Sequence, residues 1–85
     1  MKPKRLLDRI QQGAVRNIAF RDMCGLAEAV GFELDRVSGS HRIFVHPQVP
    51  DLLDLQEVRG EAKPYQVRQF LQLVEKYGLS LDQDP

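Results

Sequence analysis

The short segment 38–40, Ser-Gly-Ser, limits most strongly what this chain can fold into. Residues 32–37 before it alternate apolar and polar side chains, and residues 41–46 after it are rich in Ile, Phe and Val. Both patterns are typical of β-strands, and serine and glycine favour tight turns. A three-residue link is too short for the crossover that parallel strands need. The two strands are therefore predicted to form an antiparallel hairpin.

A third strand is predicted after this hairpin. Pro47 and Pro50 cannot donate backbone hydrogen bonds, so we expect a loop around them. Residues 53–58 then alternate apolar and polar side chains again, which predicts a strand. Residues 59–63 are mostly polar and contain Gly60, and this composition predicts a loop that leads into the last helix.

Three helices are predicted from apolar side chains at helical spacing, over residues 3–12, 21–30 and 64–77. A glycine follows each pattern, and a proline opens the first and the last, as is usual at helix ends. The order is therefore α-α-β-β-β-α, an α+β fold with a three-stranded antiparallel sheet. Such a sheet cannot leave both faces in water, so we expect the helices on one face and function on the other face or the rim.

Length and composition restrict the class of protein. Eighty-five residues fit a single domain, and 42% hydrophobic with 28% charged residues is a globular composition. No signal peptide and no apolar run of membrane-spanning length is present, so we expect a cytoplasmic protein that does not enter a membrane. The single cysteine, Cys24, excludes an internal disulfide and a multi-thiolate zinc site, and we expect it to be a small core residue rather than a reactive thiol.

The overall charge does not favour nucleic-acid binding. Twelve Lys and Arg balance twelve Asp and Glu, whereas dedicated nucleic-acid binders usually carry a basic excess. The first sixteen residues are the exception, with five basic residues and one aspartate. This N-terminal segment is predicted to be a basic helical extension, and its charge is interpreted first as a solvated helix face.

Two histidines are the candidates for chemistry. His41 follows the Gly-Ser turn, where a substrate can approach, and imidazole exchanges protons at physiological pH. His46 lies five positions further on, so a regular strand places the two rings on opposite faces, and no shared metal ion is expected. Lys63 precedes the helix that Pro64 opens, and a helix start beside a lysine attracts phosphate. The spacing alone leaves open that His41 and Lys63 are ordinary surface residues.

The run 39–47, Gly-Ser-His-Arg-Ile-Phe-Val-His-Pro, resembles the GSHxxFxHP signature of HicA-type toxins. Lys63-Pro64, followed by a helix with Arg68 and Leu71, is similar to the start of the last helix in that family. The segment 17–22 and its following helix are also similar, so the resemblance covers a core of residues 17–79. Residues 1–16 are then an extension, and residues 80–85 a tail.

This resemblance implies a fold like a double-stranded RNA-binding domain, an mRNA-cleaving activity and inhibition by a HicB-type antitoxin. In that family the histidine of the motif is catalytic, which implies this role for His41, and the resemblance carries Lys63 over as a phosphate contact. RNA supplies its own nucleophile, the 2′-hydroxyl, so we hypothesise a metal-independent endoribonuclease without a cofactor. In this hypothesis Arg42 or Lys63 stabilises the charge on the phosphate, and Ser40 helps to position it. Two features depart from the family: the chain is neutral overall, and residues 1–16 are additional. The alternative is a non-catalytic module of the same fold that binds RNA or another protein.

Overall fold

A computed structural model describes residues 1–81 of the chain. Within these residues the order is α1 (Pro3–Gln11), α2 (Phe20–Ala29), β1 (Glu33–Ser38), β2 (His41–His46), β3 (Val49–Val58), β4 (Glu61–Ala62) and α3 (Pro64–Tyr77). The strands form one antiparallel sheet in the order β1-β2-β3-β4. The predicted α+β class and the β1–β2 hairpin are thus confirmed. The predicted tail falls largely on residues 82–85, which lie outside the described residues.

The strand count was wrong by one, because the described residues hold four strands and not three. Arg59 and Gly60, expected in a loop, both adopt positive φ angles of 53° and 80°. Such a two-residue turn reverses the chain sharply, so Glu61 and Ala62 can pair with the end of β3. The added strand is short, but it carries the chain directly into α3.

The loop predicted around Pro47 and Pro50 was also too long. Only residues 47 and 48 separate β2 from β3, and Pro50 is the second residue of β3. A proline is tolerated there because the register between β2 and β3 shifts between Phe44 and His46, so this part of the ladder is irregular. The third strand therefore starts four residues earlier than the alternation predicted.

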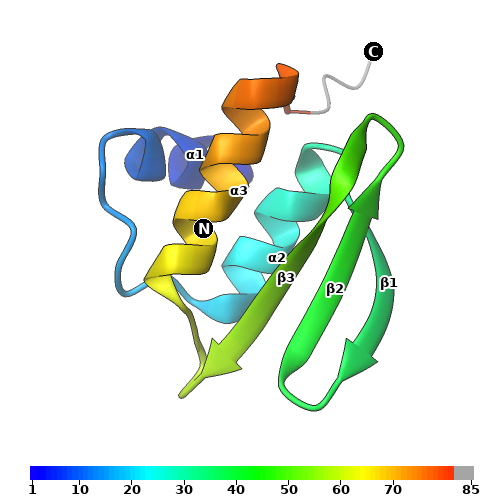
Figure 1. Ribbon diagram of the computed structural model, residues 1–85. Coiled ribbons are helices and arrows are strands. Elements are labelled where there is room, and N and C mark those ends of the chain that lie inside the picture. Colours follow the sequence, from blue (N-terminus) through cyan, green and yellow to red (C-terminus); the bar gives the residue numbers. More distant parts are fainter. Residues whose placement is uncertain (82–85) are drawn as a thin grey trace.

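The helices lie on one side of the sheet, as expected (Figure 1). α3 packs beside β3, α2 lies behind the sheet, and α1 contacts both of the other helices. All six residues of β1, at the sheet edge, are exposed. The largest fully buried side chains are Phe32, Phe44, Phe70, Leu6, Ile10, Ile18, Met23, Leu26, Leu53, Leu55 and Val67. Since Leu6 and Ile10 belong to α1, the basic N-terminal helix is part of the core packing.

Candidate active site

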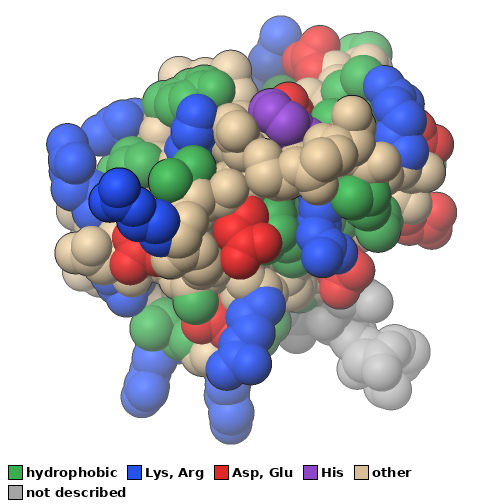
Figure 2. Space-filling view, turned by 90° about the horizontal axis from the view of Figure 1, so that it is seen from below, with side chains coloured by type: hydrophobic (Ala, Val, Ile, Leu, Met, Phe, Trp, Pro, Cys, Tyr) green, Lys and Arg blue, Asp and Glu red, His purple; other side chains and the backbone are tan. Residues whose placement is uncertain are grey.

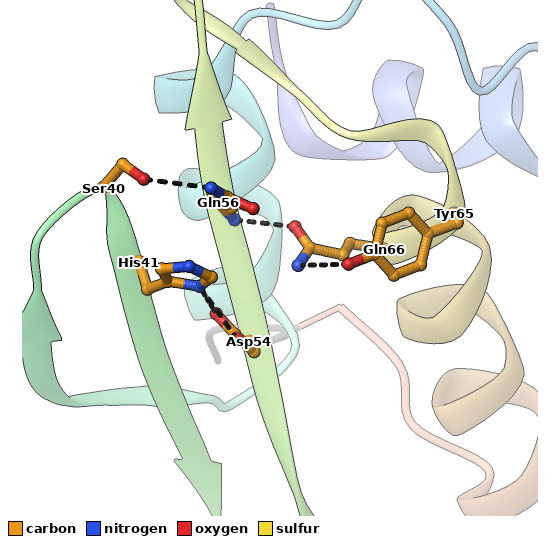
Figure 3. Close-up of polar contacts among 6 residues, drawn as sticks. All are labelled: Ser40, His41, Asp54, Gln56, Tyr65 and Gln66. Carbon is orange, nitrogen blue, oxygen red and sulfur yellow. Dashed lines mark hydrogen bonds and ion pairs between the residues drawn. The ribbon is translucent and has the colours of Figure 1, made fainter.

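His41 is the first residue of β2 and points to the face of the sheet that the helices leave open. Two residues before it lies Gly39, whose φ of +60° lets the β1–β2 turn close tightly. Its side chain is 39% exposed. Nδ1 of His41 lies 2.9 and 3.0 Å from the two carboxylate oxygens of Asp54 on β3 (Figure 3). The predicted catalytic residue is therefore accessible and has a carboxylate partner.

The sheet register explains why Asp54 meets His41. β2 and β3 pair antiparallel, with His41 opposite Gln56 and Ile43 opposite Asp54. Side chains alternate along a strand, and Leu53 and Leu55 are buried in the core, so Asp54 between them must face the open side. The carboxylate thus lies diagonally across from the imidazole, within reach of its ring nitrogen.

This pair fixes how the imidazole can act. A carboxylate accepts the Nδ1–H proton, so neutral His41 carries its unshared electron pair on Nε2. No hydrogen bond forms at Nε2 within residues 1–81. Both side chains are about 40% exposed, so solvent screens the pair and its contribution to stability is about 1 kcal/mol or less. The main effect of Asp54 is therefore to orient the ring and select its tautomer.

Ser40, beside His41, begins a chain of hydrogen bonds that reaches α3 (Figure 3). The side-chain amide of Gln56 donates to Oγ of Ser40 over 3.2 Å. The backbone N–H of Gln56 donates to Oε1 of Gln66 over 2.7 Å. Gln66 in turn donates from Nε2 to the hydroxyl of Tyr65 over 3.4 Å. The start of α3 is thereby held against the strand that carries Asp54.

Lys63 lies at that same helix start, immediately before Pro64. It is partly buried, and its Nζ lies 5.9 Å from the centre of the Tyr65 ring. The backbone N–H groups of Gln66 and Val67 both donate to the carbonyl of Lys63, so the first turn leaves few amide groups for an anion. A phosphate bound here would depend chiefly on the lysine charge. The hydrogen-bond chain from Ser40 ends at Tyr65, and Lys63 adjoins it through the Tyr65 ring and through its own carbonyl, which accepts from the backbone of Gln66.

Arg42 does not share the open face with His41. As the next residue on the strand, it points to the opposite side, where its guanidinium lies 5.7 Å from the centre of the Phe20 ring. The structure thus brings Asp54 to His41, links Ser40 to the start of α3 where Lys63 lies, and turns Arg42 away.

His46 faces the helices, which confirms that the two histidines lie on opposite sides. Its Nε2 donates to the carbonyl of Val30 over 2.9 Å, and its Nδ1 accepts the backbone N–H of Gln48 over 3.0 Å. Its ring packs edge-on against Phe32, with centroids 5.0 Å apart. Both ring nitrogens are therefore used in structural contacts.

Cys24 also lies on the helix side of the sheet. Burial raises the pKa of its thiol from 9.0 to about 11, while the charge of Arg42 opposes the shift. The thiol is protonated at neutral pH, as a structural residue would be. Across the part of the chain that the structure describes, His, Cys, Asp and Glu form no group of three or more that could hold a metal ion. No helix among residues 1–81 is both long and apolar enough to cross a bilayer.

Sequence reasoning missed Asp54 as the partner of His41. The signal that was missing is the length of the turn between β2 and β3. Only residues 47 and 48 form this turn, so His46 pairs with Val49, and this register brings Asp54 close to His41. The longer loop that was predicted around both prolines conceals this register. Gln66 and Tyr65 were missed as well, because nothing in their spacing predicts a contact with β3.

Comparison with known protein families gives one match to this chain. A family model described as the HicA toxin of bacterial toxin-antitoxin systems matches residues 20–76, about two thirds of the chain. The match includes the His41 turn, Asp54 and the start of α3, and it begins after α1. No curated protein and no solved structure matches the chain significantly. The family model alone covers well over half of the sequence, and the chain therefore belongs to the HicA family of bacterial toxin–antitoxin toxins.

Proposed function

We propose that this toxin is a metal-independent endoribonuclease that cleaves mRNA, with His41 as its acid and base. The observation that carries the proposal is the contact between Nδ1 of His41 and the carboxylate of Asp54 on the open face of the sheet. It leaves Nε2 unbonded within residues 1–81, next to a turn that a substrate can reach. Imidazole is the side chain best suited to transfer a proton near neutral pH, and the other histidine, His46, has both ring nitrogens in hydrogen bonds.

The chemistry uses the substrate's own nucleophile. Nε2 of His41 takes the proton from a ribose 2′-hydroxyl, and the 2′-oxygen attacks the adjacent phosphorus. The bond from phosphorus to the 5′-oxygen breaks, and that oxygen receives a proton from the imidazolium or from water. The products are a 2′,3′-cyclic phosphate and a 5′-hydroxyl. Asp54 keeps the proton of Nδ1 in place and stabilises the imidazolium that forms.

Negative charge on the phosphoryl oxygens requires a cation, and Lys63 is the favoured one. It stands at the start of α3, on the helix that Gln66 ties to β3. Arg42, the other candidate, points to the helix side and packs on Phe20, so it would contact the RNA only away from the reacting phosphate. Ser40 would position the phosphate, since its hydroxyl is held by Gln56 next to His41.

Replacing His41 by alanine in the purified protein tests the proposal. Cleavage of a message should fall by the ~10²–10⁴-fold that acid–base catalysis typically contributes, and growth arrest on expression should disappear. The fold should survive, because the side chain is partly exposed and outside the core. Wild-type cleavage should persist in excess chelator and leave cyclic phosphate ends. Unchanged cleavage by His41→Ala would remove the residue from the mechanism.

As the toxin of a toxin–antitoxin pair, the protein has an antitoxin partner. We infer that this partner is a HicB-type protein and that both act in the cytoplasm. An antitoxin that blocks cleavage must deny RNA access to His41, so it should cover the open face of the sheet. Co-expression with the protein encoded next to the toxin gene should yield a complex that does not cleave RNA.

A second candidate function is RNA binding without cleavage, and the observation that favours it is the basic excess of residues 1–16. The protein is neutral overall, yet Lys4, Arg5 and Arg9 lie on α1. On the face seen from below, where the β1–β2 turn lies, Lys and Arg side chains alternate with acidic ones and form no continuous stripe (Figure 2). A module of this kind should bind RNA with a strong salt dependence, and His41→Ala should leave that binding intact.

A further inference from the structure

Building on the proposed function, we propose that Tyr65 is a stacking platform for one base of the RNA, so that the enzyme takes single-stranded substrate beside His41. If His41 does not cleave RNA, this inference still predicts binding of a single strand. The two proposals can therefore fail separately.

Tyr65 presents an aromatic ring to solvent at the start of α3. Its exposed fraction is 53%, which is high for a large hydrophobic side chain. Lys63 lies near its ring, with Nζ 5.9 Å from the centroid, so a cation for the phosphate and a surface for the base are adjacent. Tyr77, at the other end of α3, has a similar partner in Lys76 at 5.3 Å, but it packs partly against the core. The two tyrosines therefore offer an internal comparison.

The ring of Tyr65 is held in place by a buried side chain. Gln66 is only 2% exposed, and both ends of its amide are used: Nε2 donates to the Tyr65 hydroxyl and Oε1 accepts from the backbone of Gln56. An amide is costly to bury unless it is satisfied, so this arrangement is specific. Through Gln56 the ring is connected to Ser40, next to His41 (Figure 3).

A base can stack on this ring only if it is unpaired. In an A-form duplex the faces of the bases are covered by their neighbours, whereas in single strands they are open to aromatic side chains. Stacking tolerates every base, because each has a π face. The inference thus predicts a preference for single-stranded RNA with little selection by base identity at this position.

Binding of a short single-stranded RNA with 2′-O-methyl groups tests the inference, because this ligand lacks the nucleophile and cannot be cleaved. Tyr65→Leu should weaken binding about tenfold, the scale of one base–aromatic stack. Tyr65→Phe keeps the ring and should lose less than about threefold. Tyr77→Phe serves as the matched control and should bind as the wild type does. The same sequence annealed into a duplex should bind no better to wild type than to Tyr65→Leu.

Equal single-strand affinity of wild type and Tyr65→Leu would overturn the inference, even if His41→Ala abolishes cleavage. A Tyr65→Leu defect that disappears at high salt would also overturn it, since stacking does not depend on released counterions. Because the chain has two tyrosines and no tryptophan, Tyr77→Phe leaves Tyr65 as the one emitter at its wavelength. Its fluorescence should be quenched on binding the single strand, and unchanged emission at saturation would contradict stacking.

Discussion

The two faces of the sheet place the two histidines of β2 in different surroundings. On the open face, His41 contacts Asp54 through Nδ1, and no hydrogen bond forms at Nε2 within residues 1–81. On the helix side, His46 donates from Nε2 to Val30 and accepts from Gln48 at Nδ1. The same residue type, five positions apart on one strand, is partly exposed to solvent in one case and has both ring nitrogens bonded to the protein in the other.

This difference shows that the contacts of an imidazole, more than its presence in a motif, decide whether it can transfer a proton. A ring with both nitrogens bonded to the backbone has no site left for a substrate. A ring held on one side by a carboxylate keeps its second nitrogen for chemistry and has a fixed tautomer. The run that resembles the family signature contains both histidines, and the structure places them in different surroundings.

Exchanging each histidine for glutamine gives the largest expected contrast. His41→Gln should lower RNA cleavage by ~10²–10⁴-fold and leave the midpoint of urea unfolding close to that of the wild type. His46→Gln should lower the free energy of unfolding by about 1–2 kcal/mol, because it disturbs two hydrogen bonds and the contact with Phe32, while cleavage below the melting range persists. Gel-based cleavage and urea titration measure the two effects. Loss of cleavage in a folded His46→Gln protein would break the comparison.

The fold was largely predictable from the sequence, because its signals are local. The Ser-Gly-Ser turn, the alternation of residues 32–37 and the glycines after the helices indicated the hairpin and the helix ends. β4 could not be predicted, since a two-residue strand has no periodicity and Arg59 is an unusual residue for a positive φ. Pro50 misled the prediction because an irregular stretch of β3 tolerates it.

The site was predictable only in part, because its geometry depends on register between strands. His41, Ser40 and Lys63 are found from the motif and the helix start. Asp54 requires knowing that β3 begins at Val49, and a register error at the turn moves every cross-strand neighbour. Gln66 requires knowing that α3 packs beside β3, which is a tertiary contact with no sequence signature.

The thiol of Cys24 tests how well the helix side of the sheet is closed. With its pKa raised to about 11, the folded protein should react with iodoacetamide about 10–100-fold more slowly near pH 8 than the unfolded chain does. The raised pKa also means that the thiol's contribution to stability is complete below pH 9 and is lost as the pH rises through 11. Mass spectrometry of the modified fraction gives the rates. Equal rates in the folded and unfolded protein would show that this side is open.

Gly31 tests the packing of His46 against the helix side. A Cβ at residue 31 would lie 2.7 Å from Nε2 of His46, and the backbone there has a φ of +105°. Gly31→Ala should therefore lower the free energy of unfolding by about 1–3 kcal/mol. Gly25→Ala is the matched control, since nothing lies within 4 Å of its added Cβ, and alanine favours the helix by up to about 1 kcal/mol. Urea unfolding that shows equal stability for both variants would contradict the tight contact.

Replacing Asp54 gives the smallest expected effect on the rate of RNA cleavage. It tests whether this carboxylate acts by orienting the ring of His41. Asp54→Ala should reduce the rate of RNA cleavage at saturating substrate about fivefold, equivalent to about 1 kcal/mol, because solvent already screens a pair that is about 40% exposed. Affinity for an uncleavable RNA should stay the same, since the carboxylate orients His41 and does not bind phosphate. Asp51→Ala, an exposed acid on the same strand beside α3, controls for the loss of charge.

Asp54→Asn sharpens the test further. An asparagine amide can donate to Nδ1 and so favour the tautomer with the proton on Nε2, which removes the electron pair that would accept the 2′-hydroxyl proton. If Asp54 acts by selecting the tautomer, asparagine should therefore impair cleavage at least as much as alanine does, although it is closer in shape to aspartate. Wild-type rates in Asp54→Asn would show that His41 works without its partner, because neither the charge nor the tautomer would then matter.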